Sequence, residues 1–523
     1  MQKATKETTK KSLMFRVLDA IEAAGNKLPA PTIIFLGLAV IVVVLSCLGS
    51  LMGWNATGEV LNAATGETEM TTFTVFNLLS ADGIRYMLNN AIPNFINFPI
   101  IGPTIVVIFG IGLSQESGYI ETLIRTSVGK APAKLVTPFI IFIGLMTSIA
   151  DNLGFLVLVP LAAMIYKAQK RHPVAGIAMS FAGVSAGIVS HVIIANTDVV
   201  LTGLTQASVS TVDAGYAVSQ VSNMYFMVAS CIVTIIVVTL VDKKMVSPRL
   251  GVYNPADGDG SDPLEEKEIT PQMKHAFKVA NIVLLLMIAA LVIICIPKNS
   301  VMRNPETGDL IAGSTLMQAV VPLIAIMLAV PSIVYGRLSG VFKNSNDVVN
   351  ALTKGMSSIS NFMVTMFFAA QFIDYFGSSN MGRIIALRGA SFLKTLNMPP
   401  IMLIVLFILI CCLCNVLMCS ASAKWAIFAP VFVPMLMQLN ITPELTQLAY
   451  RIGDGSTNII SPAFPFLAFM LATLKKYDKK SGFGTLMSCM MPYALATLVA
   501  WILMLAIWML IDLPLGPGAF CLL

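Results

Sequence analysis

Long apolar runs alternate with short polar stretches along almost the whole chain. Crossing a bilayer as a helix takes roughly 20 mostly apolar residues. Uninterrupted runs of about that length lie near residues 32–52, 97–115, 223–241, 278–297, 316–336, 356–376 and 485–512. Two more, 173–203 and 442–473, are broken by polar residues in their middle. The pattern predicts an all-α integral membrane protein with about nine transmembrane helices.

Two other apolar stretches, 135–167 and 400–440, are interrupted in a different way. The first has polar, Gly-containing residues at its centre, from Thr147 to Gly154, and the second has Ser420, Ser422 and Lys424. Basic residues flank the first stretch on both sides, so both of its ends favour the cytoplasm. We therefore expect two re-entrant helical hairpins whose tips are buried in protein or line a wet cavity.

Basic clusters beside the apolar runs give the orientation. The loop 53–80 carries no Lys or Arg and is expected outside, whereas the Lys cluster at 475–480 is expected in the cytoplasm. With an odd number of spans the N-terminus is cytoplasmic and the C-terminus external. The basic segment 377–399, which this topology puts outside, is interpreted as an amphipathic helix at the membrane surface.

The organisation repeats itself once. The order span, hairpin, broken span, span occurs at 97–242 and again at 356–512, and the two hairpins enter from opposite sides. Inverted repeats with broken helices are typical of secondary transporters, whose sites lie near the middle of the membrane. The predicted domains are a cytoplasmic tail 1–31, a first membrane half 32–242, a cytoplasmic linker 243–275, two spans in 276–355, the second repeat 356–512 and a C-terminal tail 513–523.

Composition agrees with this class of protein. Hydrophobic residues make up 56% and charged residues 11% of the 523 residues, and the mean hydropathy is +0.82. A soluble domain carries about 25% charged residues. The net charge of +6 lies in short clusters and not on one face, so we expect no nucleic-acid partner. The nine cysteines do not suggest a disulfide framework or a zinc site, and no cofactor is expected.

Ionisable residues inside apolar segments are costly and are therefore functional candidates. They are Asp151, Asp198, Lys424, Arg451 and Asp454. Arg451 and Asp454 are three positions apart, and two roles fit them. Either they neutralise each other on one helix face, or they act separately, with Arg451 binding a solute carboxylate and Asp454 serving in coupling. Asp198 has no cation nearby in sequence, which makes it the better proton carrier; its alternative role is to cap the broken helix.

Coupling to Na⁺ and coupling to H⁺ both fit the polar residues at the helix breaks. Unwound carbonyls and side-chain oxygens can bind Na⁺. The candidates for the coupling ion are Asp151, Asn152, Asn196, Thr197, Ser456, Thr457 and Asn458. Protons suit export and sodium suits import. Trp425, beside the second hairpin tip, is either a belt aromatic or a ring that stacks on an aromatic solute.

Several ordered segments resemble the AbgT family of p-aminobenzoyl-glutamate transporters. They are residues 25–29, 171–176, 196–199, 379–382, 422–434, 451–462 and 515–518, so the resemblance runs nearly end to end. It implies a homodimer with nine spans and two hairpins per subunit. It also implies a solute path through the inner membrane lined by Asp198, Ser422, Trp425, Pro443, Arg451, Asp454 and Pro462. Family members are associated with uptake of p-aminobenzoyl-glutamate and with export of p-aminobenzoate and sulfonamides.

Three other functions are a dicarboxylate carrier, a membrane hydrolase and a channel. The same plan of hairpins and broken helices is similar to that of sodium-coupled dicarboxylate carriers, which are the main alternative. A membrane hydrolase would need a nucleophile with a base, or metal ligands such as HExxH, and the sequence has neither, so we expect no enzyme. A channel would need a filter-like motif. The prediction is a secondary active transporter of anionic aromatic solutes that works by elevator or rocking alternating access.

Overall fold

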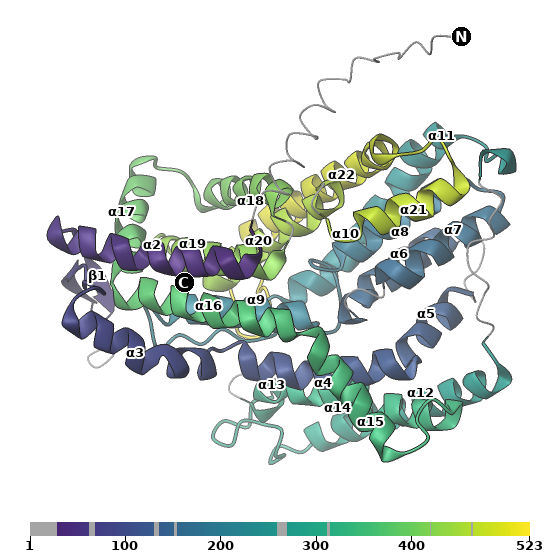
Figure 1. Ribbon diagram of the computed structural model, residues 1–523, viewed down its shortest axis with the longest axis horizontal. Coiled ribbons are helices and arrows are strands. Elements are labelled where there is room, and N and C mark those ends of the chain that lie inside the picture. The colour runs from purple at the N-terminus through teal and green to yellow at the C-terminus, as the bar shows by residue number, and fades with distance from the viewer. Residues whose placement is uncertain are drawn as a thin grey trace, which may run out of the picture.

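The computed structural model describes residues 29–61, 68–129, 135–150, 154–258, 269–310, 314–418, 420–461 and 464–523. Within these ranges the chain is almost entirely helical (Figure 1). The predicted positions Asp151, Asn152 and Pro462 lie outside the described residues.

Six stretches of helix among the described residues are long and apolar enough to cross a membrane. They are α2 (Pro31–Leu51), α3 (Ala81–Ile96) continuing through α4 (Ile101–Ser117), α10 (Met224–Val241), α12 (Pro271–Cys295), α14 (Val320–Ser339) and α22 (Phe483–Leu510). A seventh forms if α15 (Ser345–Ser358) and α16 (Ser360–Ser378), which meet at 45°, count as one span. The nine-span topology therefore stays a prediction.

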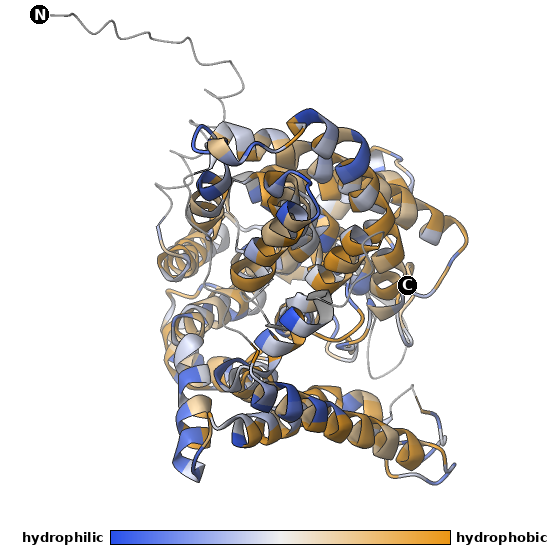
Figure 2. Cartoon of the chain, turned by 90° about the vertical axis from the view of Figure 1, so that its right-hand side faces the viewer, coloured by the Kyte–Doolittle hydropathy of each residue, from blue (hydrophilic) through white to orange (hydrophobic). Residues whose placement is uncertain are grey.

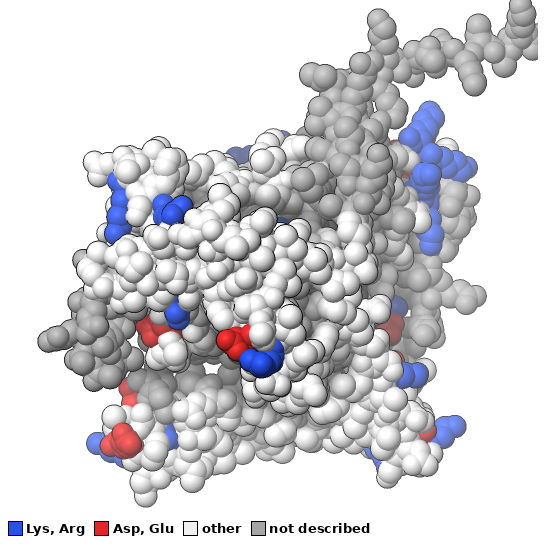
Figure 3. All heavy atoms as spheres, turned by 60° about the vertical axis from the view of Figure 1, so that its left-hand side comes forward, with Lys and Arg blue, Asp and Glu red and all other residues white. Residues whose placement is uncertain are grey.

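The long helices consist largely of hydrophobic residues (Figure 2). On α12, for example, Leu285 and Leu286 are 64% and 65% exposed. Most of the face in Figure 3 likewise carries no charged side chain. Such a surface is unfavourable in water and favourable in lipid, so the chain is that of a helical, multi-pass membrane protein.

The predicted outer loop 53–80 contains the short strands β1 (Asn55–Leu61) and β2 (Thr68–Thr74). They pair antiparallel, with Asn55 opposite Thr74 and Thr57 opposite Thr72. The prediction of helices alone missed this hairpin. Its signal was the run of Thr residues with Val and Phe, since β-branched and aromatic residues favour strands.

The first repeat places three short helices side by side. α6 (Val136–Met146) and α7 (Val159–Ala168) both pack against α8 (Pro173–Ala186). The chain then leaves the helical path at 187–195 and resumes as α9 (Asn196–Val209). The broken span predicted at 173–203 is therefore two helices joined by an irregular segment, which we call the first break.

The second repeat follows the same plan. α18 (Pro400–Leu417) and α19 (Ala421–Met437) pack against α20 (Pro443–Thr457), and a 3₁₀ turn follows α20 ahead of α21 (Leu467–Tyr477). α17 (Met381–Thr395) occupies the predicted amphipathic segment and packs on α19. Whether α17 lies at the membrane surface, and whether the hairpins are re-entrant, remain predictions.

Packing between the repeats brings their breaks together. α9 of the first repeat lies against both α19 and α20 of the second. Around this centre α2 packs on α16, α4 packs on α14, and α10 packs on α22 (Figure 1). The remaining short elements are α5 (Tyr119–Gly129), α11 (Ser247–Leu250), α13 (Thr315–Gln318), η1 (Thr147–Ala150), η2 (Gly154–Leu158), η3 (Asp242–Val246), η4 (Pro255–Asp257) and η5 (Asn458–Ile460).

Candidate functional site

An ion pair joins the two repeats at their centre. Arg451 of α20 places Nη1 2.6 Å from Oδ1 of Asp198, in the first turn of α9, and both side chains are almost fully buried. Nη1 also donates to the carbonyl of Ile188 in the first break, at 3.1 Å. The prediction that Arg451 and Asp454 might pair along one helix is wrong, because Arg451 faces the other half of the molecule.

Asp198 has two further contacts. Its Oδ2 accepts the backbone N–H of Ala195 at 2.6 Å and lies 2.8 Å from Nε2 of His191. Asp198 therefore caps the broken helix and also forms an ion pair, so the two predicted roles coexist. Asp198 has no cation nearby in sequence, but the chain folds both Arg451 and His191 onto it.

Both ring nitrogens of His191 face oxygen atoms. Nδ1 lies 2.6 Å from the carbonyl oxygen of Gly187. A carbonyl oxygen only accepts, so Nδ1 carries a hydrogen. Nε2 then faces the carboxylate of Asp198, and that contact is attractive only if a second proton lies between them. A hydrogen bond between His191 and Asp198 would therefore require one proton more than a neutral imidazole and a free carboxylate carry, beside the positive charge of Arg451.

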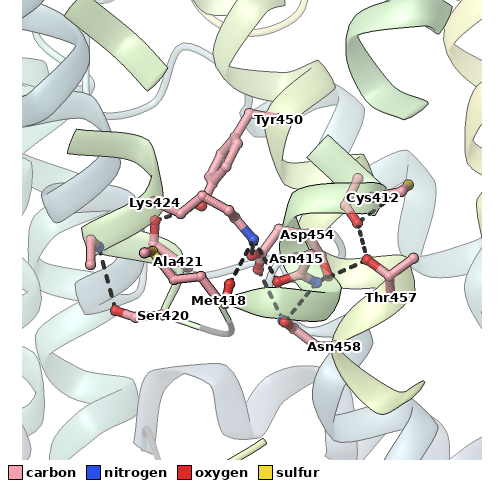
Figure 4. Close-up of polar contacts among 12 residues, drawn as sticks. Cys412, Asn415, Met418, Ser420, Ala421, Lys424, Tyr450, Asp454, Thr457 and Asn458 are labelled. Carbon is pink, nitrogen blue, oxygen red and sulfur yellow. Dashed lines mark hydrogen bonds and ion pairs between the residues drawn. The ribbon is translucent and has the colours of Figure 1, made fainter. Parts of the chain in front are cut away.

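Asp454 pairs with a different cation. Its Oδ1 lies 2.5 Å from Nζ of Lys424 on α19, and its Oδ2 accepts from Nδ2 of Asn458 at 2.9 Å (Figure 4). Asn415 of α18 completes the cluster: its Oδ1 accepts from Lys424 at 2.5 Å. All of these side chains are buried. The second repeat therefore holds its own neutral ion pair.

Trp425 is fully buried and its indole is already stacked. The ring lies on Tyr450, with centroids 4.5 Å apart and an interplanar angle of 28°. Its Nε1 donates to Oγ1 of Thr205 at 2.9 Å and to the carbonyl of Leu201 at 3.2 Å, both on α9. In this conformation Trp425 joins the halves of the molecule. The expected stacking of a solute on its ring would need a rearrangement.

The other predicted site residues do not all lie near the Arg451–Asp198 ion pair. Asn196 and Thr197 begin α9 beside Asp198, and Oδ1 of Asn196 is buried without a hydrogen-bond partner among the described residues. Ser422 lies in the first turn of α19. Pro443 begins α20, about 12 Å along the helix axis from Arg451 at 1.5 Å per residue, so the structure does not bring it to the ion pair.

The second-half candidates for a coupling ion already have protein partners. Asn415 Nδ2 lies 2.9 Å from Thr457 Oγ1 and from Asn458 Oδ1. Ser456 donates to the carbonyl of Gly453 at 3.2 Å. No group of three or more His, Cys, Asp or Glu suited to a metal ion occurs among the described residues.

Sequence reasoning left several members of these clusters out of the predicted site. Lys424 was recognised as an intramembrane charge but was assigned no role there. His191 was not among the predicted site residues. Asn415 lies within the apolar run 400–417 and gave no signal beyond being polar. Gln447 also went unnoticed; its Nε2 donates to Oδ1 of Asn223 at 3.2 Å, between the two halves.

A cavity of about 550 Å³ lies away from these ion pairs. It is lined by residues of α3, α16 and α17 and by the end of α9, including Tyr86, Asn94, Asp374 and Arg383. The Tyr86 hydroxyl donates to the Asp374 carboxylate at 3.0 Å. α9 therefore runs from the ion pair at Asp198 to the wall of this cavity at Ser210, about 18 Å along its axis.

Comparison with known proteins identifies the family of this chain. Residues 16–523 match the family described as "AbgT putative transporter family". The chain is 32% identical over 500 residues to the p-aminobenzoyl-glutamate transport protein of Escherichia coli (strain K12), covering 96% of each chain.

Two solved structures have the same fold. One is the YdaH transporter of Alcanivorax borkumensis, described as having an unusual topology, with 33% identity and a TM-score of 0.87 over 94% of this chain and all of that one. The other is MtrF of Neisseria gonorrhoeae, from a class of antimetabolite efflux pumps, with 38% identity and a TM-score of 0.89 over 96% of this chain and all of that one.

Proposed function

Because the chain belongs to the AbgT family of transporters, we propose that it is a secondary active transporter of anionic aromatic solutes. These solutes are p-aminobenzoyl-glutamate, p-aminobenzoate and related antimetabolites such as sulfonamides. The protein would work in the inner membrane as a homodimer, with its N-terminus in the cytoplasm and its C-terminus outside. The names of its relatives support this class of solute, and the predicted inverted repeats support alternating access.

Arg451 carries the proposal. Its guanidinium is 1% exposed, and a cation buried at this depth is costly unless it has a function. Asp198 and the carbonyl of Ile188 engage Nη1, while Nε is buried with no hydrogen-bond partner among the described residues. A solute carboxylate that accepts from Nε would satisfy this donor, because guanidinium groups bind carboxylates through more than one nitrogen.

The contact between His191 and Asp198 supports proton coupling, because a hydrogen bond between the two side chains requires an added proton. With that proton in place, Arg451, His191 and Asp198 together carry one net positive charge. A monoanionic solute neutralises it, so proton and solute each make binding of the other more favourable. When the proton is lost, the charge of Asp198 neutralises that of Arg451, and the affinity for the anionic solute falls. The solute and the proton then travel together in the same direction.

The proposal is tested by solute flux in proteoliposomes. Labelled p-aminobenzoate and p-aminobenzoyl-glutamate are offered with a proton gradient alone, a Na⁺ gradient alone, or neither. We expect the proton gradient to drive accumulation and Na⁺ to be dispensable. Accumulation of a simple dicarboxylate such as succinate under a Na⁺ gradient, without flux of the aromatic solutes, would establish the dicarboxylate carrier instead.

Asp198→Asn is the matching variant. Asn resembles the protonated acid but cannot exchange the proton, so the variant should keep some solute exchange and lose proton-driven accumulation. Full proton-driven accumulation by Asp198→Asn would remove this carboxylate from coupling.

A further inference from the structure

The ammonium group of Lys424 lies inside a cage of oxygen atoms at the second helix break. Nζ contacts Oδ1 of Asn415 and Oδ1 of Asp454, both at 2.5 Å, and the carbonyl of Met418 at 3.5 Å (Figure 4). The side chain is 1% exposed. Met418 follows the end of α18 and precedes α19, so its carbonyl is one that the helix break has freed from helical hydrogen bonding.

These ligands are of the kind that a small hard cation binds. Side-chain oxygens of Asp and Asn, together with an unwound backbone carbonyl, are what broken helices offer to Na⁺. Two further oxygens of this break, Oγ1 of Thr457 and Oδ1 of Asn458, already accept from the amide of Asn415. Nζ occupies the position on which the oxygens of Asn415, Asp454 and Met418 converge.

The helix break of the first repeat differs in how its polar residues are bound. Oδ1 of Asn196, at the start of α9, is a buried acceptor without a hydrogen-bond partner among the described residues. In the second repeat, Oδ1 of Asn458 accepts a hydrogen bond from Asn415, and Asp454 forms an ion pair with Lys424. At the helix break of the second repeat, therefore, the chain itself supplies a cation.

We propose that Lys424 is a tethered cation that fills an ion site in the second repeat, so that this half of the transporter needs no Na⁺. This inference rests on the proposed transport function, because the site is defined by the broken helices of a carrier. It assigns Lys424 a positioning role: the ammonium holds Asp454, α18 and α19 together as a bound ion would. Removing the side chain should leave a vacant site of monovalent-cation size.

The test compares two substitutions in the purified full-length protein. Lys424→Ala removes the charge and opens space beside Asp454, whereas Lys424→Met removes the charge and fills most of the space. Melting midpoints are measured in NaCl and in choline chloride at equal ionic strength. We expect Lys424→Ala to be destabilised in choline and to recover as NaCl is raised, with a saturable shift larger than that of the wild type. Lys424→Met should be destabilised in both salts.

Two results would overturn the proposal. One is a Na⁺ response of Lys424→Ala no larger than that of the wild type or of Lys424→Met. The other is a Lys424→Ala protein that fails to fold in either salt while Lys424→Ala/Asp454→Asn folds, because a vacant ion site should be rescued by Na⁺. In the double variant the unpaired carboxylate is gone, so its midpoint should show no additional response to Na⁺.

Flux measurements separate this inference from the transport function. Wild-type flux should be unchanged when choline replaces Na⁺ on both sides of the membrane, and Lys424→Ala should acquire a requirement for Na⁺. If neither protein moves aromatic anions but the melting shift is present, the cation site stands and the proposed function fails. If the wild type transports normally and the shift is absent, the tethered-cation inference fails alone.

Discussion

Arg451 contacts Asp198 across the two repeats at 2.6 Å and does not pair with Asp454, three positions away on its own helix. The centre of the molecule therefore holds two ion pairs, each joining different elements. Arg451 and Asp198 connect α20 with α9, and Lys424 and Asp454 connect α19 with α20. A movement of one repeat against the other would separate Arg451 from Asp198 unless both side chains move together. The Lys424–Asp454 pair lies within the second repeat and can stay intact.

Replacing Arg451 by Lys should weaken binding of an anionic aromatic solute by about tenfold or more. The ammonium keeps the charge but loses the Nε donor, and a hydrogen bond to a charged group contributes about 1.5–3 kcal/mol, which is about 10–100-fold in the dissociation constant. The measurement is equilibrium binding of labelled p-aminobenzoate to the purified protein. Wild-type affinity in Arg451→Lys would exclude Arg451 as the carboxylate ligand.

Replacing His191 by Gln should abolish proton-driven accumulation and flatten the dependence of flux on pH. Gln can still donate to the carbonyl of Gly187, but it cannot hold a proton for Asp198. The measurement is initial flux in proteoliposomes across a range of external pH. His172→Gln is the matched control, because His172 caps α8 outside the ion cluster. An unchanged pH profile in His191→Gln would show that the proton is carried elsewhere.

Trp425→Phe should be modestly destabilised and should bind aromatic solutes within a few-fold of wild type. The Phe ring can still stack on Tyr450, but the variant loses the hydrogen bonds from Nε1 to Thr205 and Leu201, at a net of about 1 kcal/mol for a typical hydrogen bond, together with the buried volume of the second indole ring. Melting midpoint and solute affinity are measured on one preparation. A large, selective loss of affinity for aromatic solutes, with the midpoint unchanged, would indicate direct stacking on the solute.

Gly453→Ala should destabilise the protein by about 1–3 kcal/mol, the usual cost of overpacking. A Cβ at this position would lie 2.6 Å from Cβ of Cys411 and 2.8 Å from the carbonyl of Ile408, so α18 and α20 could not stay as close. Gly37→Ala is the control, because a Cβ there meets nothing within 4 Å. The free energies are compared by denaturant titration in detergent. Equal stability of the two variants would contradict the close approach of these helices.

The sequence predicted the membrane helices and their breaks because hydrophobicity and helix-breaking residues act locally. The gap between α8 and α9 and the end of α20 fall where polar residues interrupt the apolar runs. The two-stranded hairpin was missed because a short strand signal in a polar loop is weak beside the hydrophobicity of the spans.

The pairing of the buried charges could not be predicted in the same way. Positions three apart on a helix of 3.6 residues per turn point about 60° apart, so Arg451 and Asp454 can face different neighbours. The choice between those neighbours depends on how α9 and α19 pack on α20, which is a long-range property. The absence of a cation near Asp198 in sequence was thus no guide to its surroundings in the fold.

The two ion pairs also determine how the membrane potential acts on the carrier. Arg451, Asp198, Lys424 and Asp454 sum to zero charge, so the empty, deprotonated protein can reorient without electrical work. Adding one proton and one monocarboxylate again gives zero, and that transit is equally insensitive to voltage. A solute with two carboxylates adds one uncompensated negative charge, on which a potential of 100 mV does about 2.3 kcal/mol of work across the full field. In a cell that is negative inside, the membrane potential would therefore favour outward movement of dianions and would not bias the direction in which a monoanion moves with its proton.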